Sequence, residues 1–342
     1  MKRCFSFVTV SVCAALVLLA ASGLHAADFY QGKTIRITIG TSPGGGYDAW
    51  GRVVSRHIGK HIPGKPTVIV ENMPGAGGLI QINNLFAATK PDGLTVGYIL
   101  GALLLTEALD QPGYHFDPQK FTYIGSVNRE NIILALGKKA GIATAAQWRA
   151  ASVPVKFGGT SKGSAVDNYL RMVKDVLGFP MQVVSGYKGT TEVRLALEGG
   201  EVGGGAPSWD SAKTSWKALI DKGDVTIFAV GASKRLKDLP NVPVASEFAR
   251  NDEEKRIFGI VVDSQNDYSR VFAVPPGTPK DRVEILQKAF ENMVKDSEFL
   301  AEVDKMKVTL EYASAEEVTS AVSTLGKMDS NLKAKLKKIL FD

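Results

Sequence analysis

Residues Thr34–Asp48 read TIRITIGTSPGGGYD, and this stretch decides what kind of fold the chain can adopt. The β-branched run Ile35–Ile39 is typical of a buried strand, and it is followed by three consecutive glycines, Gly44, Gly45 and Gly46. A helical pattern then begins. A glycine-rich loop at a helix N-terminus exposes backbone N–H groups, and the helix macrodipole favours negative charge there. The stretch therefore predicts a strand–loop–helix unit that binds an anion.

Strand and helix signals keep alternating after this stretch. The sequence predicts helices over Ala49–Ile62 and Ile80–Ala88, and strands over Thr67–Val70 and Thr95–Leu100. This βαβαβ order is typical of a parallel sheet with helices on both faces.

A second series of elements follows. We expect strands at Ile132–Leu136, Val153–Phe157, Met181–Val184, Val225–Val230 and Val271–Val274, and helices at Ala145–Ala150, Ala165–Leu177, Thr191–Leu197, Lys280–Leu300 and Ala315–Leu340. Two α/β lobes fit this pattern better than one large sheet. We predict that residues 27–125 with 251–342 form the first lobe and residues 126–250 the second, with the amphipathic C-terminal helix docked on the first.

The N-terminus has the layout of a secretory signal peptide. Lys2 and Arg3 give a basic start, Phe5–Ala21 is nearly all apolar, and small residues lead to Ala26. The apolar run is a little short for a membrane span, so an uncleaved anchor is the weaker alternative. We predict export, with cleavage near Ala26.

The cysteines and the net charge of the chain exclude some classes of function. Cys4 and Cys13 both lie in the predicted peptide, so we expect a mature chain without disulfides or thiolate chemistry. Removing Lys2 and Arg3 leaves 39 basic residues against 35 acidic ones, a net charge near +4. Such a mild excess does not indicate nucleic-acid binding.

Three loops rich in glycine or serine each follow an expected strand and precede an expected helix. They are residues 41–48, 72–79 and 158–164. Ligands of open α/β sheets bind beyond the C-terminal ends of the strands, so we expect these loops to face one another across a cleft. The alternative is that the glycines serve only tight turns with positive φ.

A dinucleotide site is another interpretation of the first loop. Gly44–Ala49 matches G-x-G-x-x-A, and Glu71 ends the next strand, where a ribose-binding acid would lie. An exported chain meets little NAD, however, and no complete G-x-x-x-x-G-K-[ST] motif for a nucleoside triphosphate is present. Nucleotide binding is therefore the weaker hypothesis.

Catalytic side chains are scarce in the sequence. His57 and His61 lie four residues apart and could share a metal ion, but no Glu follows His57, so H-E-x-x-H is absent. Apolar residues on the same helix face favour partly buried or surface histidines. No histidine lies near Ser164 and Asp167. We predict no enzyme activity, no metal and no cofactor.

Aromatic and basic residues near the expected cleft are further candidates. Tyr47 adjoins the glycine loop, and Trp209 and Asp210 follow a run of small residues. Trp209 could belong either to the core or to a cleft wall. Lys162 and Lys188 could attract a carboxylate, although solvated surface lysines are the commoner case.

Seven short motifs occur in the order of a known family: Tyr30–Ile35, Ser42–Asp48, Glu71–Gly78, Pro91–Gly93, Tyr187–Gly189, Leu239–Pro243 and Pro276–Pro279. In this order they resemble the periplasmic solute-binding receptors of tripartite tricarboxylate transporters, the Bug receptors. The resemblance covers essentially the whole mature chain. It implies a two-lobed, type II periplasmic-binding-protein fold that closes around a di- or tricarboxylate or an aromatic acid.

The resemblance also implies a monomer that delivers its ligand to a membrane permease in the periplasm. A sensor domain and an exported hydrolase or lyase are the alternatives. The implied ligand-binding residues are Ser42, Gly44, Gly45, Gly46, Tyr47 and Asp48 in the first loop, Gly75, Ala76, Gly77 and Gly78 in the second, and Thr160, Ser161, Gly163, Ser164, Trp209 and Asp210 in the second lobe.

Overall fold

The computed structural model describes residues 29–44, 46–160, 162–263, 266, 268–306 and 308–341. The predicted signal peptide, residues 1–26, lies outside these ranges, as do Gly45 and Ser161 of the predicted ligand site. Across the described part of the chain, no helix combines the length and the apolar character that crossing a membrane requires.

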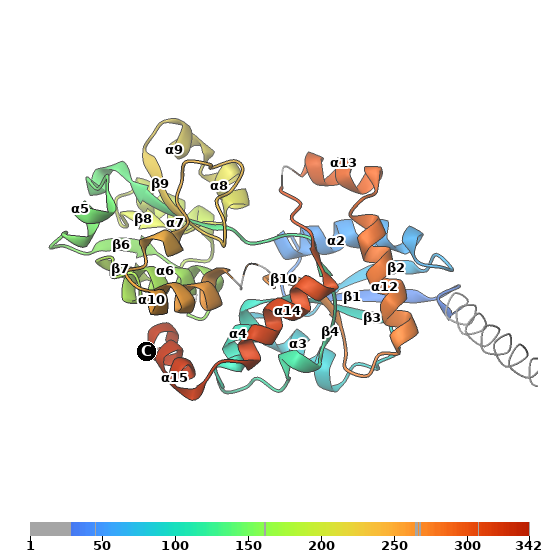
Figure 1. The fold of residues 1–342 in the computed structure, drawn as a ribbon. Helices are drawn as coiled ribbons and strands as arrows, with labels where there is room; N and C mark the ends of the chain where they lie inside the picture. The colour runs from blue at the N-terminus through green and yellow to red at the C-terminus, as the bar shows by residue number, and fades with distance from the viewer. Residues whose placement is uncertain are drawn as a thin grey trace, which may run out of the picture. The chain divides into compact units, whose positions relative to one another are not determined.

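Figure 1 shows the elements of the fold. The strands are β1 Thr34–Ile39, β2 Thr67–Asn72, β3 Thr95–Leu100, β4 Thr122–Ser126, β5 Ile132–Gly137, β6 Val155–Gly158, β7 Met181–Val184, β8 Gly204–Gly205, β9 Val225–Gly231, β10 Arg270–Val274 and β11 Ala313–Ser314. The helices are α2 Gly46–Ile58, α3 Leu79–Ala87, α4 Ala102–Ala108, α5 Ala145–Arg149, α6 Ala165–Asp175, α7 Thr190–Glu198, α8 Trp209–Ser215, α9 Lys217–Asp221, α10 Asp252–Phe258, α12 Lys280–Met293, α13 Ser297–Lys305, α14 Ala315–Gly326 and α15 Ser330–Phe341.

The chain divides into two compact units. The first comprises the described residues of Met1–Ile99, Lys120–Gly125 and Phe272–Met306, and the second those of Leu100–Gln119, Ser126–Val271 and Lys307–Asp342. The lobe boundaries expected from the sequence stay a prediction.

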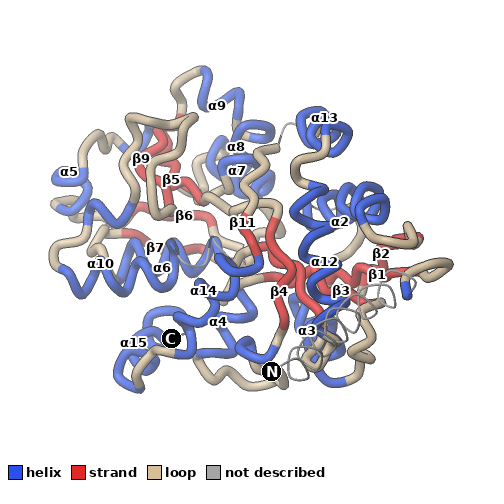
Figure 2. The backbone as a smooth tube through the Cα atoms, turned by 45° about the vertical axis from the view of Figure 1, so that its right-hand side comes forward, coloured by secondary structure: helices blue, strands red, loops and turns tan. Residues whose placement is uncertain are grey.

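The first unit contains β4, β10, β3, β1 and β2, which are neighbours in this order in a six-stranded sheet. Of these strands, β1, β2 and β3 run in parallel, as the βαβαβ pattern predicts. β1 pairs in parallel with both β2 and β3, and Ile37 lies opposite Val70 on one side and Val96 on the other. The carboxyl ends of β1 and β2, which lead into the first two glycine loops, therefore lie side by side (Figure 2).

Helices cover both faces of this sheet, as the sequence predicts. Tyr98 of β3 points to the α2 face, where its ring lies 5.1 Å from that of Tyr47. Gly97 points to the opposite face and meets α3, because a Cβ at this position would lie 2.1 Å from Leu85 Cδ2. The alternation follows from the period of two of a β-strand.

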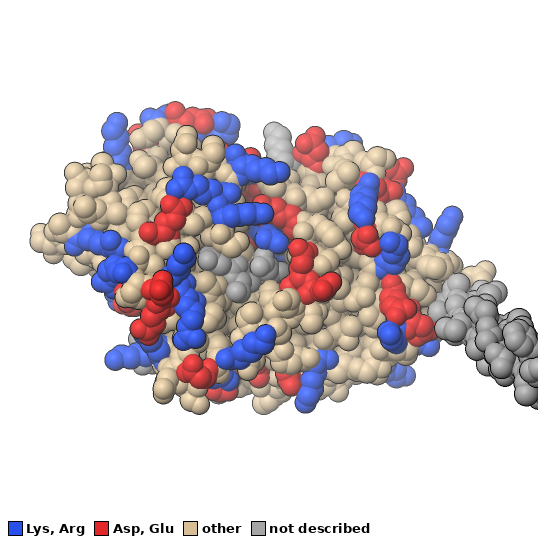
Figure 3. All heavy atoms as spheres, viewed as in Figure 1, with Lys and Arg blue, Asp and Glu red and all other residues tan. Residues whose placement is uncertain are grey.

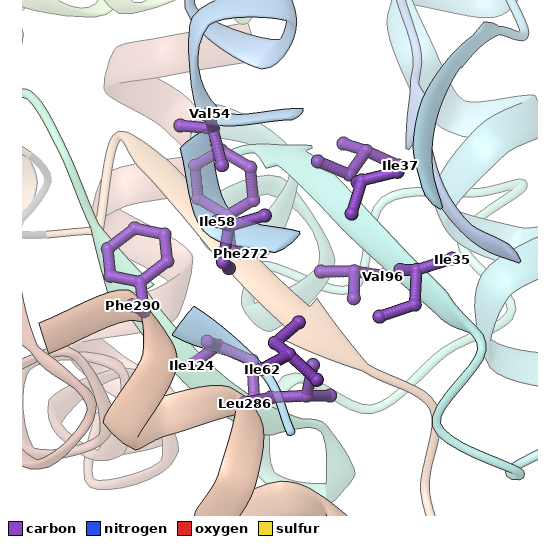
Figure 4. Close-up of a pocket in the computed structure, with 11 residues that line it drawn as sticks. Ile35, Ile37, Val54, Ile58, Ile62, Val96, Ile124, Phe272, Leu286 and Phe290 are labelled. Atoms are coloured by element: carbon purple, nitrogen blue, oxygen red, sulfur yellow. The ribbon is translucent and has the colours of Figure 1, made fainter. Parts of the chain in front are cut away.

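The core of the first unit contains a small packing gap between α2, α12 and the sheet (Figure 4). Its volume is about 10 Å³, and it is lined by Ile35, Ile37, Val54, Ile58, Ile62, Val68, Val96, Ile124, Phe272, Leu286 and Phe290. A gap of this size holds at most one water, and these apolar side chains offer it no hydrogen bond. It is part of the core and not a ligand site.

The second unit has a mixed sheet in the order β7-β6-β8-β5-β9. β6 runs parallel to β7 and β8, whereas β5 runs antiparallel to β8 and β9. Fully buried Trp148 and Trp216 pack in the core of this unit. The two sheets and their helices confirm the predicted α/β class.

The helix expected over Lys280–Leu300 is in fact two helices, α12 and α13. Asp296 causes the break, because its Oδ1 accepts hydrogen bonds from the amides of Glu298 (3.0 Å) and Phe299 (3.2 Å) and so begins a new helix.

The helix expected over Ala315–Leu340 is also two helices, α14 and α15. Asp329 accepts a hydrogen bond from the Leu332 amide at 2.8 Å, just before α15. The expectation that the C-terminal helix docks on the first lobe is wrong, because α15 packs against α6 in the second unit. Its buried face is a leucine stripe at a spacing of four, Leu332, Leu336 and Leu340.

Candidate anion-binding loops

The first loop connects β1 to α2. The helix begins at Gly46, within the glycine run and earlier than the expected Ala49, so Tyr47 and Asp48 lie in its first turn. Ser42, Gly44 and Gly46 are exposed. The loop therefore presents backbone to solvent at the N-terminus of a helix of 13 residues, where anions are favoured.

Asp48 organises this loop from within. Its side chain is buried, and its Oδ2 accepts hydrogen bonds from the Gly44 amide and from Arg52 Nε, both at 2.9 Å. Its Oδ1 accepts one from Asn72 Nδ2 at 3.0 Å. With both oxygens engaged by the chain, this carboxylate shapes the loop around it.

The charge of Asp48 is strongly stabilised. The hydrogen bond from Arg52 is the main cause that lowers its pKa to about 2, and the bonds from Gly44 and Asn72 act in the same direction, whereas burial opposes them. The loop thus holds a buried carboxylate that is already paired with a guanidinium.

Asn72 and Gly40 tie the first loop to the second. Asn72 Nδ2 also donates to the Thr41 carbonyl at 3.0 Å, so this side chain bridges β2 and the first loop. A Cβ at Gly40 would lie 2.7 Å from Gly78 Cα, which leaves room for glycine alone unless the backbone shifts. The structure therefore brings the two predicted loops of the first unit together.

The second loop follows an unusual backbone path. Gly75, Ala76, Gly77 and Gly78 all have positive φ, between 47° and 142°. Ala76, at 47°, lies in the left-handed region, which costs a residue with a Cβ about 1–2 kcal/mol. Such strain at a loop that leads into α3 is typical of a ligand-binding position.

The third loop lies in the second unit, and hydrogen bonds to the first turn of α6 hold its backbone in a similar way. Ser164 caps α6 by accepting from the Asp167 amide at 3.2 Å, and its hydroxyl lies 2.8 Å from that of Thr160. Fully buried Asp167 accepts from the Thr160 amide at 2.6 Å and from the Ser185 hydroxyl. Asn168 donates to the Gly163 carbonyl at 3.3 Å. As in the first loop, an aspartate in the first helical turn orders the backbone before it.

Trp209 contributes to the core of the second unit. Its ring is half-buried against the apolar cluster around Trp216, and its Nε1 donates to Asp238 at 3.0 Å. Lys213 Nζ lies 5.8 Å from the ring centroid.

Asp210 binds chain segments that are far apart in the sequence. Its Oδ1 accepts from the Thr309 hydroxyl at 3.1 Å and pairs with Lys213 at 3.0 Å, and its Oδ2 accepts from Asn128 at 3.1 Å. Both carboxylate oxygens thus have protein partners within the second unit. Lys162 and Lys188 are exposed side chains.

Arg52 is a site residue that the sequence prediction did not include. A signal for it exists, because Asp48 and Arg52 stand at i and i+4, the spacing of a helical ion pair.

Two of the loops also match the nucleophile-elbow pattern G-x-S-x-G, at Gly40–Gly44 and Gly159–Gly163. The pattern by itself does not define a catalytic site, which also needs a histidine base. On α2, His57 Nε2 lies 2.7 Å from Glu302, an α13 residue, and is held there rather than beside Ser42. Ser161, the central serine of the second match, lies outside the described residues.

Residues 51–325 match the family described as tripartite tricarboxylate transporter family receptor, TctC. The match covers most of the chain, and the chain belongs to this family of periplasmic solute-binding receptors. The family resemblance seen in the motifs is thereby confirmed.

Individual relatives agree with this assignment. The chain is 29% identical over 298 residues to the UPF0065 protein in the gbd 5′ region of Cupriavidus necator, covering 85% of this chain and 84% of the relative. A TctC solute-binding protein from Polaromonas has a TM-score of 0.69 at 21% identity and covers 91% of this chain and 98% of its own.

Two structures from Rhodopseudomonas palustris share the fold at 18% identity. Rpa4515 with adipate has a TM-score of 0.65, with 90% of this chain and 97% of that one covered. MatC with bound malate has a TM-score of 0.62, with 90% and 99% covered. At this identity the likeness shows the fold, which is that of the periplasmic binding proteins.

Proposed function

We propose that this protein captures a small organic carboxylate, without chemical conversion, and passes it to a tripartite-tricarboxylate-type membrane permease. The observation that carries the proposal is the arrangement in the first unit, where the loops after β1 and β2 meet and lead into the N-termini of α2 and α3. Carboxylates suit such a site because they accept hydrogen bonds from backbone N–H groups.

The energetics of such a site are adequate without an arginine clamp. A hydrogen bond to a charged group contributes about 1.5–3 kcal/mol. Micromolar binding requires about 8 kcal/mol. Four or five such bonds contribute about 6–15 kcal/mol, and the upper part of this range reaches that value after the ordering of groups on binding is subtracted. The bound malate and adipate of the two Rhodopseudomonas palustris structures make dicarboxylates the first class to test.

We further propose distinct roles for the predicted site residues. In the first unit, the amides and hydroxyls of the first two loops contact the ligand and Tyr47 flanks it. In the second unit, the third loop and Trp209 are the candidate contacts. Asp48 and Asp210, whose carboxylates already have protein partners, position the surrounding backbone. The chain acts as an exported monomer in the periplasm, after cleavage of its signal peptide near Ala26.

The test is calorimetric titration of the purified protein with malate, adipate, citrate and benzoate, with phosphate and ATP in parallel. We expect saturable binding of at least one carboxylate, with a dissociation constant in the micromolar range or below. Binding of ATP or phosphate in the absence of any carboxylate binding would refute the proposal.

Catalysis is tested in the same samples. Because two loops match G-x-S-x-G, the bound carboxylate and its simple esters are incubated with the protein and recovered for mass spectrometry. We expect the compounds to return intact. Turnover that is lost in Ser42→Ala would instead make the protein a hydrolase.

A further inference from the structure

We propose that the contact between α2 and α13 in the first unit is a binding site for a divalent transition-metal ion of the Zn²⁺ class, with His57, Asp296 and Glu298 as ligands. This site goes beyond carboxylate capture and does not depend on it. The sequence favoured ordinary surface or partly buried histidines here, because apolar residues share the helix face and H-E-x-x-H is absent. The acidic partners lie more than 200 residues away in the chain.

The ligand atoms already lie close together. A ring nitrogen of His57, a carboxylate oxygen of Asp296 and one of Glu298 are all within 4.8 Å of one another. Two ligand atoms that share a tetrahedral zinc ion at about 2.1 Å each are about 3.4 Å apart. Atoms at the 4.8 Å limit must therefore approach each other by about 1.4 Å, which side-chain rotation at this partly exposed site allows.

His61 lies beside this group, but it is not one of the three residues whose ligand atoms all lie within 4.8 Å of one another. It lies one helical turn beyond His57, and its Nε2 is 3.5 Å from Asp296 Oδ2. This nitrogen is buried and has no hydrogen-bond partner among the described residues. Imidazole together with carboxylate is a donor set that suits zinc and its neighbours in the first transition row, whereas magnesium prefers oxygen ligands alone.

The surrounding contacts hold the ligands in place. His57 packs edge-on against Phe299, with ring centroids 5.7 Å apart, and its Nε2 bonds Glu302 at 2.7 Å. Asp296 uses Oδ1 to cap α13, which leaves Oδ2 for another partner. A ligating histidine oriented by a carboxylate is the usual arrangement around protein-bound metals.

Lys60 is the group that a metal must displace. Its ammonium lies 2.8 Å from Asp296 Oδ1 and 2.6 Å from Glu298 Oε2, so a cation already sits between the two carboxylates. Acidic and basic side chains lie next to one another over α13 in Figure 3. The long lysine side chain is about one-third exposed and can swing into solvent. Lys60 thus acts as a built-in competitor.

The experiment is calorimetric titration of the full chain, without a polyhistidine tag and after removal of metals with a chelator, with ZnCl₂ and separately with MgCl₂. We expect one equivalent of Zn²⁺ to bind and Mg²⁺ not to bind. His57→Ala and Asp296→Asn should each weaken Zn²⁺ binding by about tenfold or more, which is the scale of effects at metal ligands and their neighbours. His115→Ala, a histidine of the second unit, is the matched control and should bind as the wild type does.

The Lys60→Met variant distinguishes two interpretations of this cluster, a metal site and a group of ion pairs that is purely structural. Removing the competing ammonium should tighten Zn²⁺ binding, whereas a cluster that serves only packing predicts no change. Unaltered circular dichroism and an unaltered urea midpoint in each variant verify that it is folded. The proposal is overturned if the wild type binds no Zn²⁺, if His57→Ala binds it equally well, or if Lys60→Met fails to tighten binding.

Discussion

Asp48 is the third residue of α2 in the first unit, and Asp167 is the third residue of α6 in the second unit. Each is buried and accepts a hydrogen bond from an amide of the loop before it, Gly44 in one case and Thr160 in the other. An aspartate in the first turn also suits the helix macrodipole. At the scale of single residues, these two carboxylates determine the shape of the loops.

Asp48 makes stability depend on pH in acid. Because its pKa falls from 3.8 to about 2 on folding, its contribution is fully present above about pH 4 and is lost as the pH falls toward 2. We expect the free energy of unfolding, measured with urea, to decrease less steeply over this interval in Asp48→Asn than in the wild type. An unchanged slope in Asp48→Asn would contradict the prediction, and the exposed Asp224→Asn is the control.

Gly40 is the second residue on which the pair of loops depends, because the close approach requires a position without a Cβ. Gly40→Ala places a methyl group 2.7 Å from Gly78 Cα, which is backbone and cannot turn aside. We expect a loss of stability of about 1–3 kcal/mol, the usual cost of overpacking. Gly189→Ala is the matched control, because an added Cβ there meets nothing within 4 Å. Equal urea midpoints for the two variants would rule out the close approach of the loops.

At the scale of elements, periodicity predicted most of the strands and helices to within a few residues. β3 and β7 have the predicted bounds. The failures have specific causes. Asp296 and Asp329 each interrupt a long apolar pattern by beginning a new helix, although periodicity continues across them. β4 and the short helices α4, α8, α9 and α10 were not predicted, since elements of five to seven residues carry little periodic signal.

The docking of α15 is an element-scale prediction. Leu336 is fully buried where α15 packs against α6. We expect Leu336→Ala to destabilise the protein by about 2–5 kcal/mol, as large-to-small substitutions in cores do. The exposed Lys338→Ala on the same helix should change stability by less than about 0.5 kcal/mol. Equal effects of the two substitutions in urea unfolding would show that α15 is not docked through its leucine stripe.

At the scale of the whole molecule, the chain combines two compact units. Each unit contains a loop whose backbone is held by a buried aspartate. This arrangement uses no disulfide among the described residues, which contain no cysteine. Stability therefore rests on the packing of the buried apolar residues in each unit.

Ligand binding should raise the stability of the whole molecule. At a carboxylate concentration of 100 times the dissociation constant, the free energy of unfolding should rise by about 2.7 kcal/mol if the ligand binds the folded state alone. Thermal unfolding followed by circular dichroism measures the corresponding rise in Tm. A ligand that binds in calorimetry but leaves Tm unchanged would indicate that it also binds unfolded chains.

The sequence by itself determined the α/β class, the places of the glycine loops and the family, because strand periodicity, glycine runs and short motifs are local signals. Only the tertiary structure showed that Asp48, Arg52 and Asn72 form one network, that Asp210 holds Thr309, and that His57 meets Asp296 and Glu298. These contacts join residues from separate elements, in several cases far apart in the chain. Local patterns do not encode which distant side chains packing brings together, and the chemistry of these sites depends on that packing.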